Sequence, residues 1–282
     1  MKQFATITVI GKDKTGVIAK VTNFLFQTRA NIEALEEQVN SGQFSMSLQA
    51  SWTKAHFDES KLRAGFTDIS RELQMEIRVR IVENNRRQRL AILVTKEPHC
   101  FEAIMASIKA KTLKADPCVV IGNHELLKPL ADKFKLPFHY VPFGKDRLAA
   151  EHKMIELVDQ YNADFIALAR FMKILSPQFV WRWKNKIINI HPSLLPAFPG
   201  ASPYWQAFEK GVRIAGVTSH FVTTNLDEGP IIWQESFTVD PTDSLKEIKI
   251  KGQKLESKTL VKALQLYVNK RLDVHWGKVY RF

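Results

Sequence analysis

The sequence predicts an α/β protein in which a small β-α-β-β-α-β domain precedes a larger domain built on a mostly parallel sheet. Within the first 82 residues, two amphipathic helical segments are interspersed among four β-rich segments in that order. After residue 90, short apolar strand-like segments alternate with helical ones. A length of 282 residues suits two domains. We expect domains at residues 1–82 and 90–282, joined by a polar linker at residues 83–89.

The elements of the first domain follow from the spacing of its apolar residues. A β-branched segment predicts the first strand, and Val17, Val21 and Leu25 fall at helical spacing after it. The sequence Asn40-Ser41-Gly42 is a hairpin signal between two further strands. In chain order we expect a strand at residues 4–10, a helix beginning at Val17, strands at 32–39 and 43–52, a helix at 58–73 and a strand at 75–81. This order is that of the ferredoxin-like fold.

The second domain is predicted from apolar segments of strand length separated by helical ones, a pattern typical of a parallel sheet. The expected strands are at residues 90–94, 119–121, 138–141, 165–168, 186–188, 214–222 and 231–239. The last two lie close together in the sequence and are expected to pair antiparallel at one edge. Residues 243–271 predict one helix or two, because Gly252 weakens a single continuous helix.

Composition excludes several classes of protein. The hydrophobic fraction of 45% and the charged fraction of 25% are ordinary for a globular chain. No apolar segment approaches the roughly 18 residues of a membrane helix, and the start lacks a signal peptide, so no membrane partner is expected. Cys100 and Cys118 lack the spacing of metal ligands. We therefore expect a cytoplasmic protein without a metal ion or a cofactor.

The chain is basic, and the excess positive charge lies in the second domain. Residues 1–82 carry a net charge of +2, whereas residues 83–282 carry +10. Such a surface attracts anions of any kind. The charges are dispersed and are not interleaved with aromatic residues, so no nucleic-acid partner is expected.

Three polar residues follow strand-like segments of the second domain. Asn189 and His191 close the segment at residues 186–188, and Asp227 follows the segment at residues 214–222. Residues i and i+2 of a strand point to one face, and active sites of open α/β sheets lie at the carboxyl ends of strands. An amide can donate to an oxyanion, and an imidazole beside a carboxylate can move protons. These residue types together suit acyl-type chemistry.

Rival catalytic motifs are missing from the sequence. It contains no Gly-x-Ser-x-Gly motif, no P-loop and no His-Glu-x-x-His zinc motif. His99 and Cys100 are adjacent in the chain, which seldom gives a working Cys-His pair. The predicted site therefore rests on Asn189, His191 and Asp227.

Residues 189–201, 220–222 and 226–232 resemble the folate-dependent formyltransferase superfamily, which uses an Asn-His-Asp triad on a Rossmann-like sheet. The resemblance implies that Asn189 holds the formyl oxygen, that His191 stabilises the oxyanion and passes a proton to the folate nitrogen, and that Asp227 positions the nucleophile and sets the charge state of His191. Residues 168–175 resemble the loop that borders the folate. The folate site implied in this way comprises Arg170, Phe171, Met172, Ile174, Leu175, Val222, Thr223, Thr224 and Asn225.

The first domain resembles an ACT domain, and an ACT domain ahead of this catalytic domain resembles the formyltetrahydrofolate deformylases. This resemblance implies hydrolysis of 10-formyltetrahydrofolate to formate and tetrahydrofolate, which supplies formate for purine synthesis. The folate is then a small-molecule substrate and no cofactor is needed. The resemblance also implies an amino-acid effector at Asp13, Lys14 and Gly16, and a homo-oligomer, either a dimer or a tetramer.

The nucleophile is the point on which the alternatives differ. The loop at residues 94–100 has no glycine and contains Pro98, unlike the phosphate-binding loop of glycinamide ribonucleotide transformylases. Water is therefore the expected nucleophile. Pro192 and Trp205 stand where deformylases often have histidine. Two alternatives stay open: a formyltransferase acting on an amine, such as glycinamide ribonucleotide or a sugar nucleotide, and a folate-binding or amino-acid-sensing regulatory protein with a weakened active site.

Overall fold

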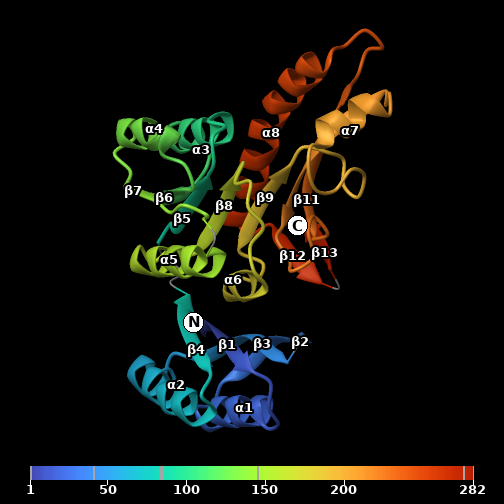
Figure 1. Ribbon diagram of the computed structural model, residues 1–282. Helices are drawn as coiled ribbons and strands as arrows, with labels where there is room; N and C mark the ends of the chain where they lie inside the picture. Colours follow the sequence, from blue (N-terminus) through green and yellow to red (C-terminus); the bar gives the residue numbers. More distant parts are fainter. Residues whose placement is uncertain (1, 41, 83–85, 145, 276, 282) are drawn as a thin grey trace. The chain divides into compact units, whose positions relative to one another are not determined.

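The computed structural model describes residues 2–40, 42–82, 86–144, 146–275 and 277–281. The chain divides into two compact units, Met1–Arg86 and Arg87–Phe282, called unit 1 and unit 2 below (Figure 1). Of the linker expected at residues 83–89, residues 83–85 lie outside the described residues. Gln88 and Arg89 already belong to the first strand of unit 2, because they continue the parallel pairing of that strand.

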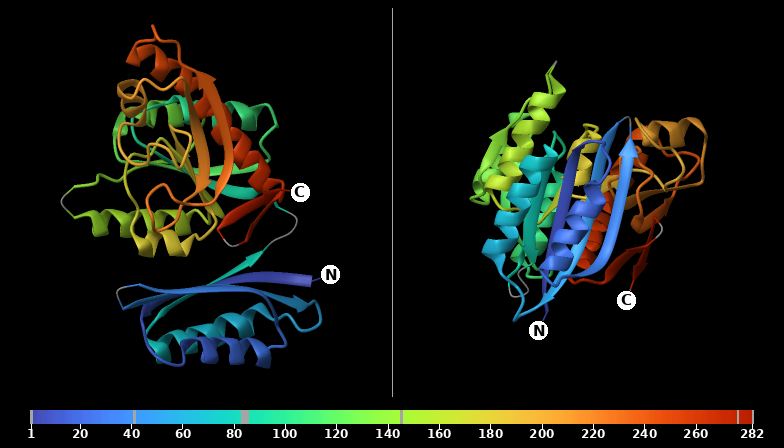
Figure 2. Two further views of the ribbon diagram at one scale, coloured as in Figure 1. Left: turned by 90° about the vertical axis from the view of Figure 1, so that its right-hand side faces the viewer. Right: turned by 90° about the horizontal axis from the view of Figure 1, so that it is seen from below.

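Unit 1 is an antiparallel sheet with the strand order β2-β3-β1-β4, and both helices lie on one of its faces (Figure 2). The fold class predicted from the sequence is confirmed. Its elements are β1 (Lys2–Lys12), α1 (Val17–Gln27), β2 (Asn31–Asn40), β3 (Gln43–Thr53), α2 (Glu59–Leu73) and β4 (Glu76–Val82). The predicted hairpin places Asn40 opposite Gln43, and Ser41 between them lies outside the described residues.

The core of unit 1 forms where the apolar stripes of the two helices meet the inward side chains of the sheet. Val21 and Leu25 of α1 and Phe66 of α2 share one cluster with Ile7 and Leu48 of the strands. All five are nearly or completely buried. The helical spacing of the apolar residues in the sequence is therefore explained by their burial against the sheet.

Unit 2 is built on a seven-stranded sheet with the order β11-β10-β9-β8-β5-β6-β7 (Figure 1). The five strands from β5 to β9 are parallel to one another. Strand β10 pairs antiparallel with β9 on one side and with β11 on the other, and the antiparallel pairing of β10 with β11 is the one predicted for the edge. The strands are β5 (Gln88–Val94), β6 (Ala115–Gly122), β7 (Phe138–Tyr140), β8 (Phe165–Ala169), β9 (Ile187–His191), β10 (Ile214–Phe221) and β11 (Ile231–Thr238).

Helices cover both faces of this sheet, so the central strands are apolar on both sides. On β5, Ile92 belongs to the cluster that packs under α3, α4 and α8, whereas Leu93 belongs to the cluster under α5 and α6. The helices are α3 (His99–Lys109), α4 (Lys128–Lys133), α5 (Arg147–Gln160), α6 (Pro177–Arg182), α7 (Pro203–Glu209) and α8 (Leu245–Val268), with a short 3₁₀ turn at Glu125–Leu127. No helix among the described residues is long and apolar enough to cross a membrane.

The last helix, α8, is continuous through Gly252 and begins with a capping box between Ser244 and Glu247. A Cβ atom on Gly252 would lie 2.1 Å from the hydroxyl oxygen of Tyr204, which belongs to α7. Glycine at this position therefore permits the close approach of two helices. After α8, β12 (Leu272–His275) and β13 (Lys278–Arg281) pair antiparallel, and these two strands are not among those predicted from the sequence.

Gly252→Ala is expected to destabilise unit 2 by about 1–3 kcal/mol, although the same change in an open helix stabilises by about 1 kcal/mol. The added methyl group must displace Tyr204 from a close-packed position. Urea unfolding measures the difference. Gly144→Ala is the matched control, because a Cβ atom there meets no atom within 4 Å. A Gly252→Ala variant as stable as the control would contradict the expectation.

Candidate active site

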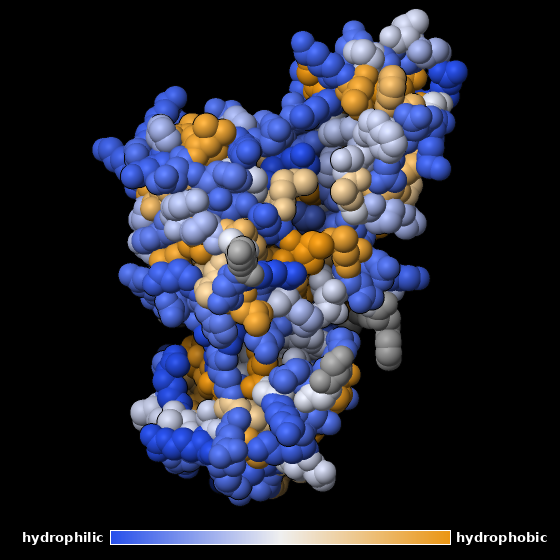
Figure 3. Space-filling model, in the orientation of Figure 1, coloured by the Kyte–Doolittle hydropathy of each residue, from blue (hydrophilic) through white to orange (hydrophobic). Residues whose placement is uncertain are grey.

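A cavity of about 590 Å³ opens in unit 2 at the carboxyl ends of β8 and β9. Apolar surface is exposed in the middle of unit 2 and is framed by polar surface (Figure 3). The cavity wall includes all twelve catalytic and folate-binding residues expected from the sequence: Arg170, Phe171, Met172, Ile174, Leu175, Asn189, His191, Val222, Thr223, Thr224, Asn225 and Asp227. Residues that are distant from one another in the sequence therefore line one cavity.

The strand β9 brings Asn189 and His191 to the cavity. It pairs with β8 in parallel and with β10 antiparallel, so that Asn189 lies opposite His220 and His191 lies opposite Thr218. Neighbours on both sides fix the direction of the strand. Because the two residues are separated by one position, both side chains point to the same face.

Asp227 reaches this face from the loop between β10 and β11. Its backbone adopts a left-handed conformation with φ of 57°, and its carboxylate accepts a hydrogen bond of 2.8 Å from the backbone N–H of Gly200. Two residues later the chain passes close to the end of β10. A Cβ atom on Gly229 would lie 1.7 Å from the carbonyl oxygen of Phe221. Glycine there permits the tight return that places Asp227 beside His191.

His191 and Asp227 form a buried pair with a defined tautomer. Asp227 Oδ2 lies 3.4 Å from His191 Nδ1, and both side chains are nearly inaccessible to solvent. His191 Nε2 lies 3.0 Å from the carbonyl oxygen of Phe198, which can only accept, so Nε2 carries a proton. The other ring nitrogen, Nδ1, is therefore the one that faces the carboxylate.

His220 orients the amide of Asn189, a role that its position in the sequence does not indicate. Its Nδ1 atom donates to the carbonyl oxygen of Phe221 at 2.9 Å, which leaves Nε2 to accept from Asn189 Nδ2 at 3.1 Å. Burial lowers the pKa of His220 below its usual value, which keeps the ring neutral and able to accept. One N–H of Asn189 is thereby held by His220, and the other can donate to a ligand.

Acid should weaken the fold through His220, and the sign follows from its lowered pKa. The unfolded chain takes up a proton near pH 6.5, but the folded chain does not until a lower pH. The stability linked to His220 is therefore complete above pH 6.5 and is lost as the pH falls below it, by up to about 1.4 kcal/mol per pH unit. Urea unfolding of wild type and His220→Gln between pH 8 and pH 5 tests this. If the free energy of unfolding falls equally in both proteins as the pH is lowered, the expectation is wrong.

A second group of polar side chains surrounds Glu256, which is completely buried in α8. Its carboxylate accepts hydrogen bonds from Tyr204 Oη at 2.6 Å and from His99 Nε2 at 2.8 Å, and Arg170 Nε lies 3.3 Å away as an ion pair. Burial alone would raise the pKa of Glu256, but the bond from His99, the charge of Arg170 and the bond from Tyr204 lower it below its usual value. We call these four residues the Glu256 cluster.

Cys100 lies beside the Glu256 cluster, and His99, Cys100 and Glu256 offer three ligand atoms within 4.8 Å of one another. The chemistry of the group does not favour a metal ion there, because Arg170 already supplies the positive charge next to the carboxylate. Burial first, and then the charge of Glu256, raise the pKa of the Cys100 thiol well above its usual value. The thiol thus stays protonated and poorly nucleophilic.

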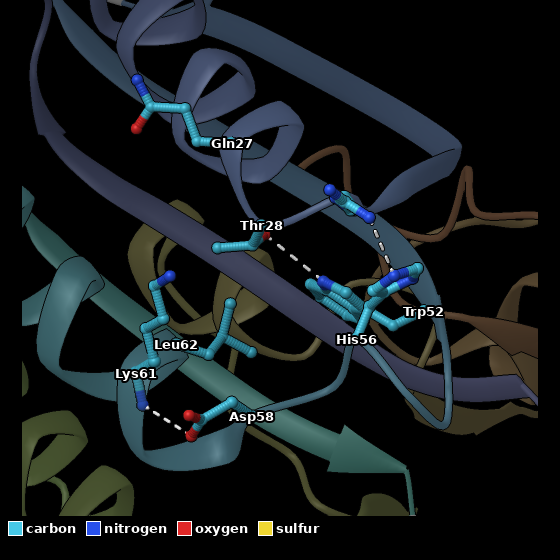
Figure 4. A pocket seen from close by; sticks show the side chains of 8 residues that line it. Gln27, Thr28, Trp52, His56, Asp58, Lys61 and Leu62 are labelled. Carbon is cyan, nitrogen blue, oxygen red and sulfur yellow. Dashed lines mark hydrogen bonds between the residues drawn. The ribbon is translucent and has the colours of Figure 1, made fainter.

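The expected effector residues lie in the turn between β1 and α1 of unit 1. Asp13 and Lys14 are exposed, and the Asp13 N–H donates to the carbonyl oxygen of Gly42 at 2.9 Å. A cavity of about 160 Å³ lies at Trp52, near the end of β3 at which Thr53 pairs with Lys2. Figure 4 shows the side chains that line it. The cavity does not include the turn residues, and is lined by Gln27, Thr28, Arg29, Trp52, His56, Asp58, Lys61 and Leu62.

Two families match the two units. Residues 3–80 match the ACT domain family, and residues 88–264 match the formyl transferase family. Among curated proteins, the formyltetrahydrofolate deformylase of Bacillus subtilis is 38% identical over 274 residues, which is 96% of this chain and 91% of that protein. The chain belongs to the formyltetrahydrofolate deformylase family. The deformylase of Escherichia coli strain K12 is also 38% identical, over 98% of this chain and 97% of that protein.

Solved structures are similar to this chain over its whole length or over part of it. A formyltetrahydrofolate deformylase from Pseudomonas syringae has a TM-score of 0.69 at 32% identity, and the match covers 100% of this chain and 95% of that one. A glycinamide ribonucleotide transformylase from Symbiobacterium toebii has a TM-score of 0.68 at 28% identity, but covers only 71% of this chain. The deformylase structure therefore matches both units of this chain, whereas the transformylase structure matches a smaller part of it.

Proposed function

We propose that this protein hydrolyses 10-formyltetrahydrofolate to formate and tetrahydrofolate in the cavity of unit 2, with Asn189, His191 and Asp227 as its catalytic residues. The observation that carries the proposal is that the amide of Asn189 and the buried pair of His191 and Asp227 lie together in the wall of a cavity of about 590 Å³. A cavity of that volume suits one drug-sized ligand. Family membership at 38% identity supports the same activity.

The wall offers a surface that suits a folate. Phe171 and Leu175 contribute apolar side chains, and the segment at residues 223–225 contributes polar groups for the hydrogen-bonding edge of the pterin ring. Lys173 and Lys249 also line the cavity and can attract the carboxylates of a glutamate tail. We infer a folate lying along the loop after β8 with its formyl group towards His191.

The proposed reaction transfers the formyl group to water. The water oxygen bonds to the formyl carbon, and one of its protons passes to the His191–Asp227 pair. The resulting oxyanion is stabilised by the free N–H of Asn189 and by the positive charge that forms on His191. The carbon–nitrogen bond then breaks as a proton from the same pair is given to the folate nitrogen. Atoms and charge balance to formate, tetrahydrofolate and a released proton.

Incubation of the protein with 10-formyltetrahydrofolate alone tests the proposal. Formate and tetrahydrofolate should appear in equal amounts without any added amine. Product that forms only when an amine acceptor is added would instead identify a formyltransferase. Tight binding of the folate without turnover would identify a regulatory protein with a weakened site, and either result would overturn the proposed hydrolase.

We also propose that unit 1 joins copies of this chain in the cytoplasm and binds an amino-acid effector near Asp13, Lys14 and Gly16. The outer edge of β2 supports the first part, because nearly all its residues are exposed and its backbone groups can pair with another strand. Both cysteines are buried and free, which suits a reducing compartment. Light scattering of the purified protein should give a multiple of 32.4 kDa. A monomer at micromolar concentration would contradict this.

A further inference from the structure

The Glu256 cluster joins the cavity wall to the interior of unit 2. Arg170 and Tyr204 line the cavity, whereas Glu256 and His99 lie behind them. Burial of an unpaired carboxylate raises the free energy of the folded state. The three residues that contact Glu256 are therefore strongly held beside it. The two wall residues are therefore held in place from behind by one negative charge.

The backbone at Arg170 gives a second, independent observation. Arg170 has a positive φ of 62°, a conformation that favours glycine and costs free energy for other residues. This conformation sets the direction in which the Arg170 side chain leaves the loop after β8. That side chain is almost fully buried and points to Glu256.

The neighbouring loop after β5 is fastened to the same helix. Glu97 accepts a hydrogen bond of 3.1 Å from Gln253 Nε2 and lies 3.8 Å from Lys249 Nζ, and Ser257 Oγ donates to the carbonyl oxygen of His99 at 3.1 Å. Thr95 Oγ1 accepts from the N–H of Met172, which ties this loop to the loop of Arg170. Hydrogen bonds thus join the loop after β5 both to α8 and to the loop of Arg170.

We propose that Glu256 is a positioning residue that holds Arg170 and Tyr204 as a wall, and that this wall confines the cavity to one organic ligand and so makes water the nucleophile. The inference rests on the proposed hydrolysis at His191 and Asp227. It assigns the choice between water and an amine to residues that do not touch the reacting atoms. Without the wall, a primary amine reaches the formyl carbon, its nitrogen replaces the folate nitrogen on that carbon, and the amine proton passes to the folate.

The test measures how the formyl group divides between water and glycinamide, a small primary amine. Wild type with 10-formyltetrahydrofolate and glycinamide should release formate almost exclusively. Glu256→Ala should raise the ratio of formylglycinamide to formate at least tenfold, and Glu256→Gln, which keeps the volume but removes the charge, should give a smaller rise. A change in this ratio separates positioning from simple loss of stability, which lowers both products together.

Milder variants keep the test decisive if Glu256→Ala does not fold. Tyr204→Phe removes only the hydroxyl group and should raise the ratio about threefold. Thr259→Val, an equally buried site on the same helix and outside the cavity wall, should leave the ratio at the wild-type value. Unchanged ratios in folded Tyr204→Phe and Glu256→Gln, with formate release intact, would overturn the inference alone. Absence of formate release by wild type would overturn the proposed function instead.

Discussion

Asp227→Asn and His191→Asn should each lower kcat by about 10³-fold or more, because each removes the proton-transferring pair on which both halves of the reaction depend. Asp227→Asn preserves the shape of the side chain but removes the negative charge 3.4 Å from His191 Nδ1. Formate release followed over time, together with folate affinity, measures the effect. Affinity should change far less than kcat.

The double variant gives the sharper result. If His191 and Asp227 act as a unit, the double substitution should be no worse than the more damaging single one. His152→Asn is the matched control, since His152 is exposed on α5 and lies outside the cavity wall. Strictly multiplicative losses, or wild-type turnover by either single variant, would exclude the proposed pair.

Gly229→Ala should lower activity about 100-fold although residue 229 does not line the cavity. The added methyl group would overlap a backbone carbonyl, which cannot rotate away as a flexible side chain can. The loop must therefore shift and carry Asp227 with it. The same overlap should destabilise unit 2 by about 3 kcal/mol.

Kinetics and urea unfolding of this variant, compared with Gly144→Ala, separate the two effects. The Gly144→Ala variant should keep wild-type activity, because the position is open. Its free energy of unfolding should change by no more than about 0.5 kcal/mol. A Gly229→Ala variant with full activity would show that the loop can accommodate the methyl group without moving Asp227.

The elements and much of the site could be predicted because their signals are local. The spacing of Val17, Val21 and Leu25 identifies a helix in any fold, and a β-branched segment and a hairpin signal identify strands of unit 1. Asn189 and His191 are close in sequence and share a face for the same reason. The motif around Asp227 then placed the third residue in the same cavity.

The parts that could not be predicted depend on contacts between distant residues. Tyr204 and Glu256 are separated by 52 positions, and nothing near either residue indicates that they will meet. Gly252 leaves one helix or two open in the sequence, because its partner, Tyr204, belongs to another helix. His220 stood within a motif, but its role depends on the tautomer that the carbonyl oxygen of Phe221 imposes.

The pairing of His220 with Asn189 across β9 and β10 has a consequence for how this family can vary. The two residues face each other on adjacent strands, and the ring accepts from the amide at 3.1 Å. A change at residue 189 that removes the amide takes this hydrogen bond from the buried Nε2 atom of His220, at a cost of about 1–3 kcal/mol. Aligned deformylase sequences should therefore show correlated substitution at these two positions, with an acceptor at 220 wherever 189 is an amide.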